Sequence, residues 1–217
     1  SSRRHRLGGG RGSAKKPVMR WVADTGPVLH LAEAKALHLL ALLGEVVIPP
    51  AVEEELSRRQ SLLGLPAALR VVPLEAPHRT EAMDWCSAGL VDRGEAQAIA
   101  LTRQLAADVF LTDDAAARLL ATTLGLQARG SLGIVLWLAG QRRIGPAEAS
   151  QHLENLFRSS LWVSPRIREE ARAALKKSPP SHVTWRHASG DIRLRAPLQM
   201  LPHLLGHLGI EFFFAEE

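Results

Sequence analysis

"RWVADTGPVLHLAEA", residues 20–34, decides the fold class of this chain. It begins with a short apolar run typical of a strand, and the amphipathic pattern of Val28–Leu43 that follows is typical of a helix. Between them an Asp-Thr-Gly-Pro corner places Asp24 where the strand should end. An aspartate at such a point is compatible with an aspartic protease dyad, a phosphoryl-accepting nucleophile or a divalent-metal ligand.

Short apolar runs alternate with longer amphipathic runs along most of the chain. Strands are predicted at Arg20–Ala23, Glu45–Ile48, Leu69–Leu74, Asp108–Thr112 and Leu126–Ala128. Helices are predicted at Val28–Leu43, Ala51–Arg59, Thr80–Ser87, Gly94–Leu105, Asp114–Leu124, Leu132–Gln141, Pro146–Phe157 and Pro165–Leu175. Strands that alternate with helices favour a parallel sheet covered on both faces, so we expect an α/β fold.

The two ends of the chain depart from this pattern. Residues 1–19 are rich in Gly, Ser and Arg and lack helical periodicity, so we expect a disordered basic arm or a tag there. Residues 178–217 begin with a Pro-Pro break and form a C-terminal extension of unknown structure. Their pattern is compatible with a hairpin around Val183–Leu194 and a last helix around Leu198–Leu208, or with a loosely attached segment.

The net charge of +5 says little about partners, because of where the basic residues lie. Residues 1–20 contain seven of the 27 Lys and Arg residues and no acid, so residues 21–217 carry 20 basic against 22 acidic side chains. A basic arm alone therefore accounts for the positive charge, and a nucleic-acid groove does not follow from it.

Composition favours a soluble, cytoplasmic protein without membrane contact. No apolar run approaches the roughly 20 residues of a membrane-spanning helix, and the single cysteine, Cys86, cannot form an internal disulfide. The histidines do not suggest a zinc site: His30 and His38 are eight residues apart, and His203 and His207 lack a third ligand. No glycine-rich phosphate-binding loop occurs either.

Acidic residues lie near the ends of the predicted strands. Asp24 follows the first strand, and Asp113 and Asp114 follow the fourth. The acids at 53–55 fall in the helix after the second strand, and Glu95 opens the helix that leads into the fourth. Any one of these acids could simply be a helix cap, since the helix dipole favours an N-terminal acid by about 0.3–1 kcal/mol.

The number of segments that contribute acids favours a metal site. Ligands of an open parallel sheet bind outside the carboxyl ends of its strands. Like charges gathered there repel one another unless a cation neutralises them. Oxygen ligands without a His or Cys cluster suit Mg²⁺ or Mn²⁺ rather than zinc, and such sites typically act on phosphates.

Four blocks of sequence carry a resemblance to a known family. They are "VADTGPVLHLAEA", "EVVIPPAVEEEL", "DRGEAQAIALTRQLAADVFLTDDAAAR" and "RGSLGIVLWLAGQRRI". In this order they resemble the PIN-domain ribonucleases, in particular the VapC-like toxins of prokaryotic toxin-antitoxin pairs. The resemblance implies a three-layer α/β/α sandwich with a four- to five-stranded parallel sheet, and a PIN-like nuclease domain over residues 20–177.

The resemblance also implies a set of site residues. The catalytic, metal-binding acids fall on Asp24, Glu55, Glu95 and Asp114, with Glu54 as a register alternative to Glu55. Asp113, adjacent to Asp114, would also be able to serve as a metal ligand, and Thr112 would orient water or metal. One or two Mg²⁺ or Mn²⁺ ions held there would acidify a bound water and neutralise charge on the phosphate. Hydrolysis would leave a 5′-phosphate and a 3′-hydroxyl.

An acidic site needs basic side chains to hold RNA. Arg118, one helical turn after Asp114, is the first candidate, and Lys35, Arg58 and Arg59 are weaker ones. The chain has no Tyr and five Phe, so recognition should depend on phosphate and shape rather than on base stacking.

The resemblance implies three partners: an RNA substrate, a cognate antitoxin protein and a second copy of the chain in a homodimer. The alternative is a catalytically inactive PIN-like binding module that pairs with a regulatory protein. An aspartic protease is disfavoured because a helix follows Asp24, and a phosphatase would need Asp-x-Asp where Gly26 stands. Thr25 and Gly26 are expected to form a turn that exposes Asp24.

Overall fold

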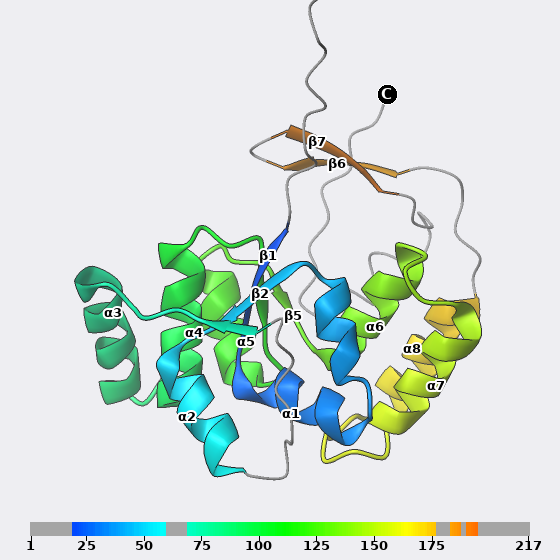
Figure 1. Ribbon diagram of the computed structural model, residues 1–217, viewed down its shortest axis with the longest axis horizontal. Coiled ribbons are helices and arrows are strands. Elements are labelled where there is room, and N and C mark those ends of the chain that lie inside the picture. The colour runs from blue at the N-terminus through cyan, green and yellow to red at the C-terminus, as the bar shows by residue number, and fades with distance from the viewer. Residues whose placement is uncertain (1–18, 60–68, 177–182, 188–189, 195–217) are drawn as a thin grey trace, which may run out of the picture.

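A five-stranded, all-parallel sheet forms the centre of the fold (Figure 1). The computed structural model describes residues 19–59, 69–176, 183–187 and 190–194. The strands, in the spatial order β3-β2-β1-β4-β5, are β1 Arg20–Ala23, β2 Glu45–Ile48, β3 Leu69–Val71, β4 Val109–Leu111 and β5 Ala128–Arg129. Each neighbouring pair is parallel, which confirms the predicted sheet.

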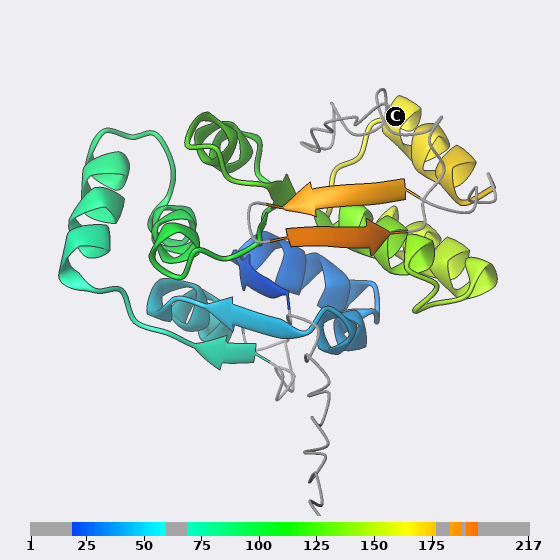
Figure 2. The ribbon, with the colours of Figure 1, turned by 90° about the horizontal axis from the view of Figure 1, so that it is seen from above.

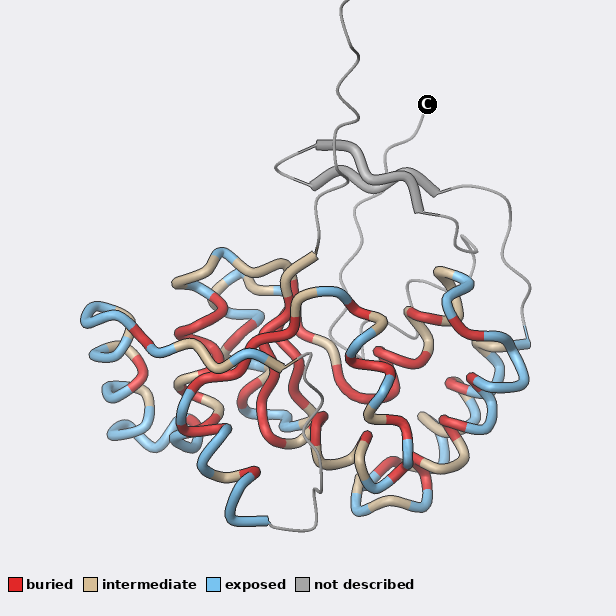
Figure 3. Tube along the Cα trace, in the orientation of Figure 1, coloured by how far each residue is buried: buried red, intermediate tan, exposed pale blue. Residues whose placement is uncertain are grey.

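Helices cover both faces of this sheet, as the view from above shows (Figure 2). They are α1 Thr25–Glu33, the 3-10 helix η1 Leu37–Leu42, α2 Pro50–Arg58, α3 Ala76–Ser87, α4 Arg93–Gln104, α5 Ala115–Thr123, α6 Ser131–Gly140, α7 Pro146–Leu156 and α8 Pro165–Lys176. Neighbouring residues of β1 face opposite ways. Trp21 packs in a core with α1, α2, α6 and α7, and Val22 in a core with α3, α4 and α5. Buried residues follow the strands and the inner sides of the helices (Figure 3), so the three-layer sandwich is confirmed.

The predicted helix Val28–Leu43 is wrong, because the chain forms two shorter helices there. α1 starts earlier, at Thr25, since Asp24 caps it, and it ends at Glu33. Lys35 then takes a left-handed conformation with φ of 55°. Its N–H and that of Ala36 bond back to the last turn of α1, as in a Schellman motif. Such a stop usually shows as glycine in a sequence, and here lysine occupies the position.

The last strand of the sheet lies further along the chain than predicted. β5 is Ala128–Arg129 rather than Leu126–Ala128, because the N–H of Thr112 donates to the carbonyl of Arg129 at 2.8 Å. This bond extends the pairing beyond β4 to the residues that carry the site.

The C-terminal extension contains the predicted hairpin. β6 Val183–His187 pairs antiparallel with β7 Gly190–Leu194. The helix expected around residues 198–208 and the arm expected at residues 1–19, except for Met19, lie outside the described residues. Within the described ranges, no helix is long and apolar enough to cross a membrane.

The strand order reverses between β1 and β4. The chain moves from β1 to β2 and β3 on one side, and returns to add β4 and β5 on the other. The carboxyl ends of these two central strands diverge into separate helices, α1 and α5. In open α/β sheets such a switch point is where ligands bind.

Candidate active site

Asp24 lies at this switch point and is buried, with 5% of its surface exposed. Its Oδ1 accepts a hydrogen bond from the N–H of Thr25 at 2.6 Å, and its Oδ2 accepts one from the hydroxyl of Thr112 at 3.4 Å. The expectation that a turn exposes Asp24 is therefore wrong, because α1 begins immediately after it and the cap holds the carboxylate inside.

Burial raises the pKa of Asp24 from 3.8 to about 7. The negative charges of Glu95 and Glu55 contribute to this rise, while the hydrogen bonds from Thr25 and Thr112 act in the opposite direction. A carboxyl in this state changes charge near neutral pH, and a nearby cation would favour the ionised form.

Glu55 reaches the site from α2, where it is half-buried. Its Oε2 accepts a hydrogen bond of 2.5 Å from the hydroxyl of Thr25. A Cβ at Gly94, in the first turn of α4, would lie 2.5 Å from Oε1 of Glu55, so the glycine makes room for the carboxylate. The alternative acid, Glu54, instead pairs with Arg58 and, at 3.0 Å, with Arg93.

Glu95 lies in the first turn of α4, where it also caps the helix. Its Oε2 accepts the N–H of Asp92 at 2.9 Å. Burial raises the pKa of Glu95, and the charges of Asp114, Asp92 and Glu55 raise it as well. The hydrogen bond from the N–H of Asp92 acts in the opposite direction. The side chain is therefore a helix cap and also a member of the acidic group.

Asp114 is exposed and caps α5 by accepting the N–H of Ala117 at 2.8 Å. Its own N–H donates to the hydroxyl oxygen of Thr112 at 3.1 Å. Because that hydroxyl also donates to Asp24, the buried Thr112 connects the first acid with the last.

Asp113, the neighbouring acid, takes part in a different network. Its Oδ2 lies 2.7 Å from Nδ1 of His30 and accepts the Ser131 hydroxyl at 2.5 Å. Its Oδ1 accepts the N–H of Ser131, the first residue of α6, at 2.7 Å. A Cβ at Gly130 would lie 2.5 Å from the same oxygen. A metal-binding role for Asp113 stays a prediction.

The candidate RNA contacts differ in their burial and in their partners. Arg118 donates to the carbonyl of Thr112 at 2.9 Å. Burial lowers the pKa of Arg118, against the opposing charges of Asp113 and Asp114. The other candidates are exposed: Lys35 follows α1, Arg58 pairs with Glu54 and Arg59 ends α2. Their part in RNA binding stays a prediction.

The four acids form one electrostatic group drawn from four segments of the chain. Asp24 is affected by Glu55 and Glu95, and Glu95 in turn by Asp114. All the donors are carboxylate oxygens, which are the ligands preferred by Mg²⁺ and Mn²⁺. The buried acid with its raised pKa fits a cation that would relieve the repulsion.

Sequence reasoning missed the residues that support these acids. Thr25 and Gly94 act on Glu55, and His30 and Ser131 act on Asp113. The contacts of Thr25 and Gly94 with Glu55 join segments far apart in the sequence, so they left no local signal. The contact of Ser131 with Asp113 spans 18 residues and has no local signal.

The comparisons with known proteins agree with this fold. The family model DUF3368, a PIN domain, matches residues 20–177. No curated protein and no solved structure matches the chain. PIN domains are generally nucleases and typically bind divalent metals. Because the matched segment covers more than half of the 217 residues, the chain belongs to the PIN-domain family.

Proposed function

We propose that the chain is a metal-dependent endoribonuclease that hydrolyses RNA phosphodiester bonds. The observation that carries the proposal is the burial of Asp24, 5% exposed, among the carboxylates of Glu55, Glu95 and Asp114, which come from three other segments of the chain. A carboxyl in such surroundings gains strongly from a cation, which removes the repulsion and favours its charged form. Membership of a family whose members are generally nucleases supports the same reading.

The proposal assigns an Mg²⁺ or Mn²⁺ ion to Asp24, Glu55, Glu95 and Asp114. When bound, such an ion acidifies a water and neutralises charge on the phosphate. The protein's own contribution is orientation. The hydroxyl of Thr25 holds Glu55, and that of Thr112 lies between Asp24 and Asp114. Both hydroxyls hold these positions without substrate, so the acids need little reorganisation during the reaction.

The choice of RNA as substrate rests on the resemblance of four sequence blocks to the PIN-domain ribonucleases. Arg118 is the first proposed phosphate contact, because its guanidinium interacts with the charges of Asp113 and Asp114. Lys35, Arg58 and Arg59 would contribute further contacts from the exposed surface.

The same resemblance supports a role as the toxin of a toxin-antitoxin pair, with a homodimer and a cognate antitoxin. Expression of the chain should then slow the growth of a bacterial host, and the product of a neighbouring small open reading frame should relieve the effect. Unchanged growth would contradict the toxin role and leave the nuclease proposal standing.

Two adjacent glutamates provide the test of the nuclease proposal. The purified chain is incubated with structured RNAs in Mg²⁺ or Mn²⁺ and in EDTA, beside Glu55→Gln and Glu54→Gln. We expect cleavage that EDTA abolishes and that only Glu55→Gln impairs, because Glu54 is engaged with Arg58 and Arg93. Absence of cleavage by the unmodified chain would favour the inactive binding module, and cleavage in EDTA would contradict the metal mechanism.

A further inference from the structure

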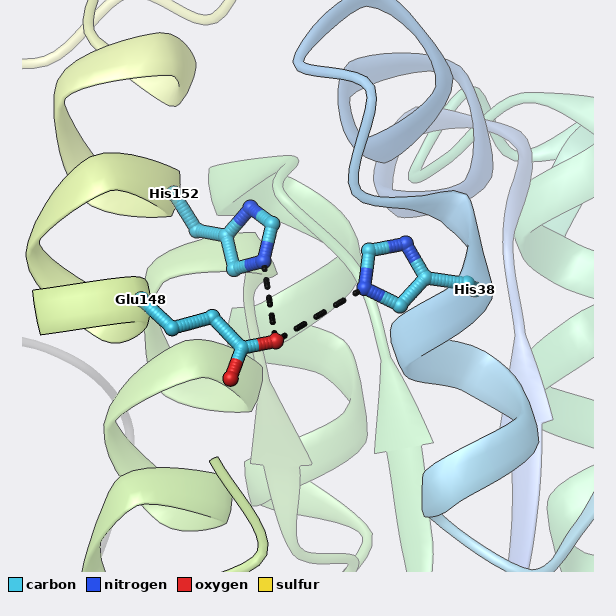
Figure 4. A group of neighbouring side chains, drawn as sticks. All are labelled: His38, Glu148 and His152. Carbon is cyan, nitrogen blue, oxygen red and sulfur yellow. Dashed lines mark ion pairs between the residues drawn. The ribbon is translucent and has the colours of Figure 1, made fainter. Parts of the chain in front are cut away.

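Three side chains outside the acidic group point toward one another at the junction of η1 and α7 (Figure 4). His38 comes from η1, while Glu148 and His152 lie one turn apart on α7. Oε1 of Glu148 is 4.0 Å from Nε2 of His38 and 3.7 Å from Nε2 of His152. The three potential ligand atoms all lie within 4.8 Å of one another.

His152 is the buried member of this group, with 8% of its surface exposed. Neither ring nitrogen has a hydrogen-bond partner in the structure. A buried polar group without a partner costs about 1–3 kcal/mol, so its presence calls for a ligand. Burial lowers the pKa of His152, and the nearby His38 lowers it as well. The charge of Glu148 acts in the opposite direction.

Glu148 is already oriented toward the two histidines. Its Oε2 accepts the N–H of Gly145 at 3.4 Å, at the start of α7. Its other oxygen, Oε1, is the atom that faces both imidazoles. The helix cap therefore acts like the outer hydrogen bonds that orient the ligands of known metal sites.

We propose that His38, Glu148 and His152 form a second metal site, selective for a borderline transition ion such as Zn²⁺. Two imidazoles and one carboxylate match a common zinc donor set, with a fourth position for water. Tetrahedral ligands at about 2.0–2.1 Å from zinc lie about 3.3 Å apart, so the two carboxylate–imidazole separations must shrink by about 0.4–0.7 Å, and the two imidazole nitrogens must approach from a separation of at most 4.8 Å. The His38 and Glu148 side chains, 56% and 48% exposed, are free enough to move by that amount.

This site differs from the acidic site in its ligand atoms and in the effect that a bound ion would have. Its nitrogen ligands favour Zn²⁺, whereas an all-carboxylate group favours Mg²⁺ or Mn²⁺. An ion here would join η1 to α7, whose Leu39 and Leu153 already share one hydrophobic core. Because it binds only the folded chain, zinc at about 100 times its dissociation constant should raise the melting temperature by about 5–10 °C.

The test compares zinc binding by the full chain with that of matched variants. The metal-free chain is titrated with Zn²⁺ in a calorimeter, beside His38→Ala, Glu148→Gln and His78→Ala. His78 is a suitable control because it also lies beside a glutamate, Glu81, at 3.2 Å, but outside the group. We expect one zinc equivalent to weaken at least about tenfold in the first two variants, and to stay unchanged in His78→Ala.

Two further measurements distinguish loss of this zinc site from loss of folding and from zinc binding at the acidic site. His38 is exposed, so His38→Ala should melt like the unmodified chain in EDTA and lose only the stabilisation by zinc. Asp24→Asn should keep the zinc equivalent, since the acidic site is separate. Equal zinc affinity and stoichiometry in the unmodified chain and in His38→Ala would overturn the proposal.

Discussion

The hydroxyl of Thr25 donates a 2.5 Å hydrogen bond to Oε2 of Glu55, across 30 residues of sequence. Thr25 is also the residue whose N–H binds Asp24, so one residue positions two of the proposed ligands. It carries no charge and would not itself bind a cation in this arrangement.

Replacing this threonine should weaken catalysis more than folding. Thr25→Val keeps the shape and the backbone N–H but removes the bond to Glu55, and loss of such an orienting bond typically costs about 10–100-fold in metal affinity or activity. The expected result is a similar fall in RNA cleavage, partly restored by higher Mg²⁺. Thr80→Val on α3 is the control, because its hydroxyl bonds only to a helix carbonyl. Equal activity of the two variants would contradict the role of Thr25.

Gly94→Ala tests the space that Glu55 occupies. The added Cβ would approach Oε1 at 2.5 Å, so the flexible end of Glu55 must move while the backbone stays. A displacement of about 1 Å can lower a rate about 100-fold, and we expect a loss of cleavage approaching that size with little change in melting temperature. Gly140→Ala, which meets nothing within 4 Å, should leave the rate unchanged. A fully active Gly94→Ala would show that the position of Glu55 does not matter.

Replacing Asp113 should lower stability, whereas replacing the neighbouring Asp114 should lower activity. Asp113→Asn removes the charge that faces His30 and Ser131, so urea unfolding should show a loss of about 1–3 kcal/mol. Asp114→Asn keeps a good helix cap, because Asn and Asp are similar at that position, and should reduce cleavage instead. If Asp113→Asn instead lost cleavage and Asp114→Asn instead lost stability, the metal-binding role would belong to Asp113.

The raised pKa of Asp24 makes the stability of the metal-free chain depend on pH. Its pKa is about 7 in the folded state against 3.8 as a model value. The folded chain therefore holds this proton to higher pH than the unfolded chain, and stability falls as pH rises from about 4 to about 7. Above that range the penalty is fully present and amounts to about 4 kcal/mol.

Asp24→Asn removes this penalty, since asparagine stays neutral. In EDTA at about pH 8 the variant should unfold at a higher urea concentration than the unmodified chain, and the difference should shrink toward about pH 4. Greater stability of the unmodified chain at the higher pH, without metal, would contradict the buried acidic state of Asp24.

Most of the fold follows from local patterns. The strand Arg20–Ala23 and the acid behind it were predictable because strand-to-helix alternation defines the sheet and its carboxyl edge. The break at Lys35 was not, because a lysine occupies a left-handed position that glycine would usually mark.

The site was predictable only in part, because its details depend on contacts between distant segments. Sequence spacing left Glu54 and Glu55 as alternatives. The structure distinguishes them, because Thr25 bonds to Glu55 and Arg93 bonds to Glu54. The pairing of His38 with His152 depends on how η1 packs against α7. The i to i+4 spacing of Glu148 and His152 was the only local signal for it.

We propose that the carboxylates around Asp24 hold a metal ion with which the chain cleaves RNA. The most direct measurement is the cleavage rate of one structured RNA in Mg²⁺ or Mn²⁺ by the unmodified chain, Asp24→Asn and Asp84→Asn. Asp84 is exposed on α3 and receives the same chemical change. We predict a loss of at least about 100-fold for Asp24→Asn alone, and complete loss for all three proteins in EDTA. Equal cleavage by Asp24→Asn and the unmodified chain would contradict the account.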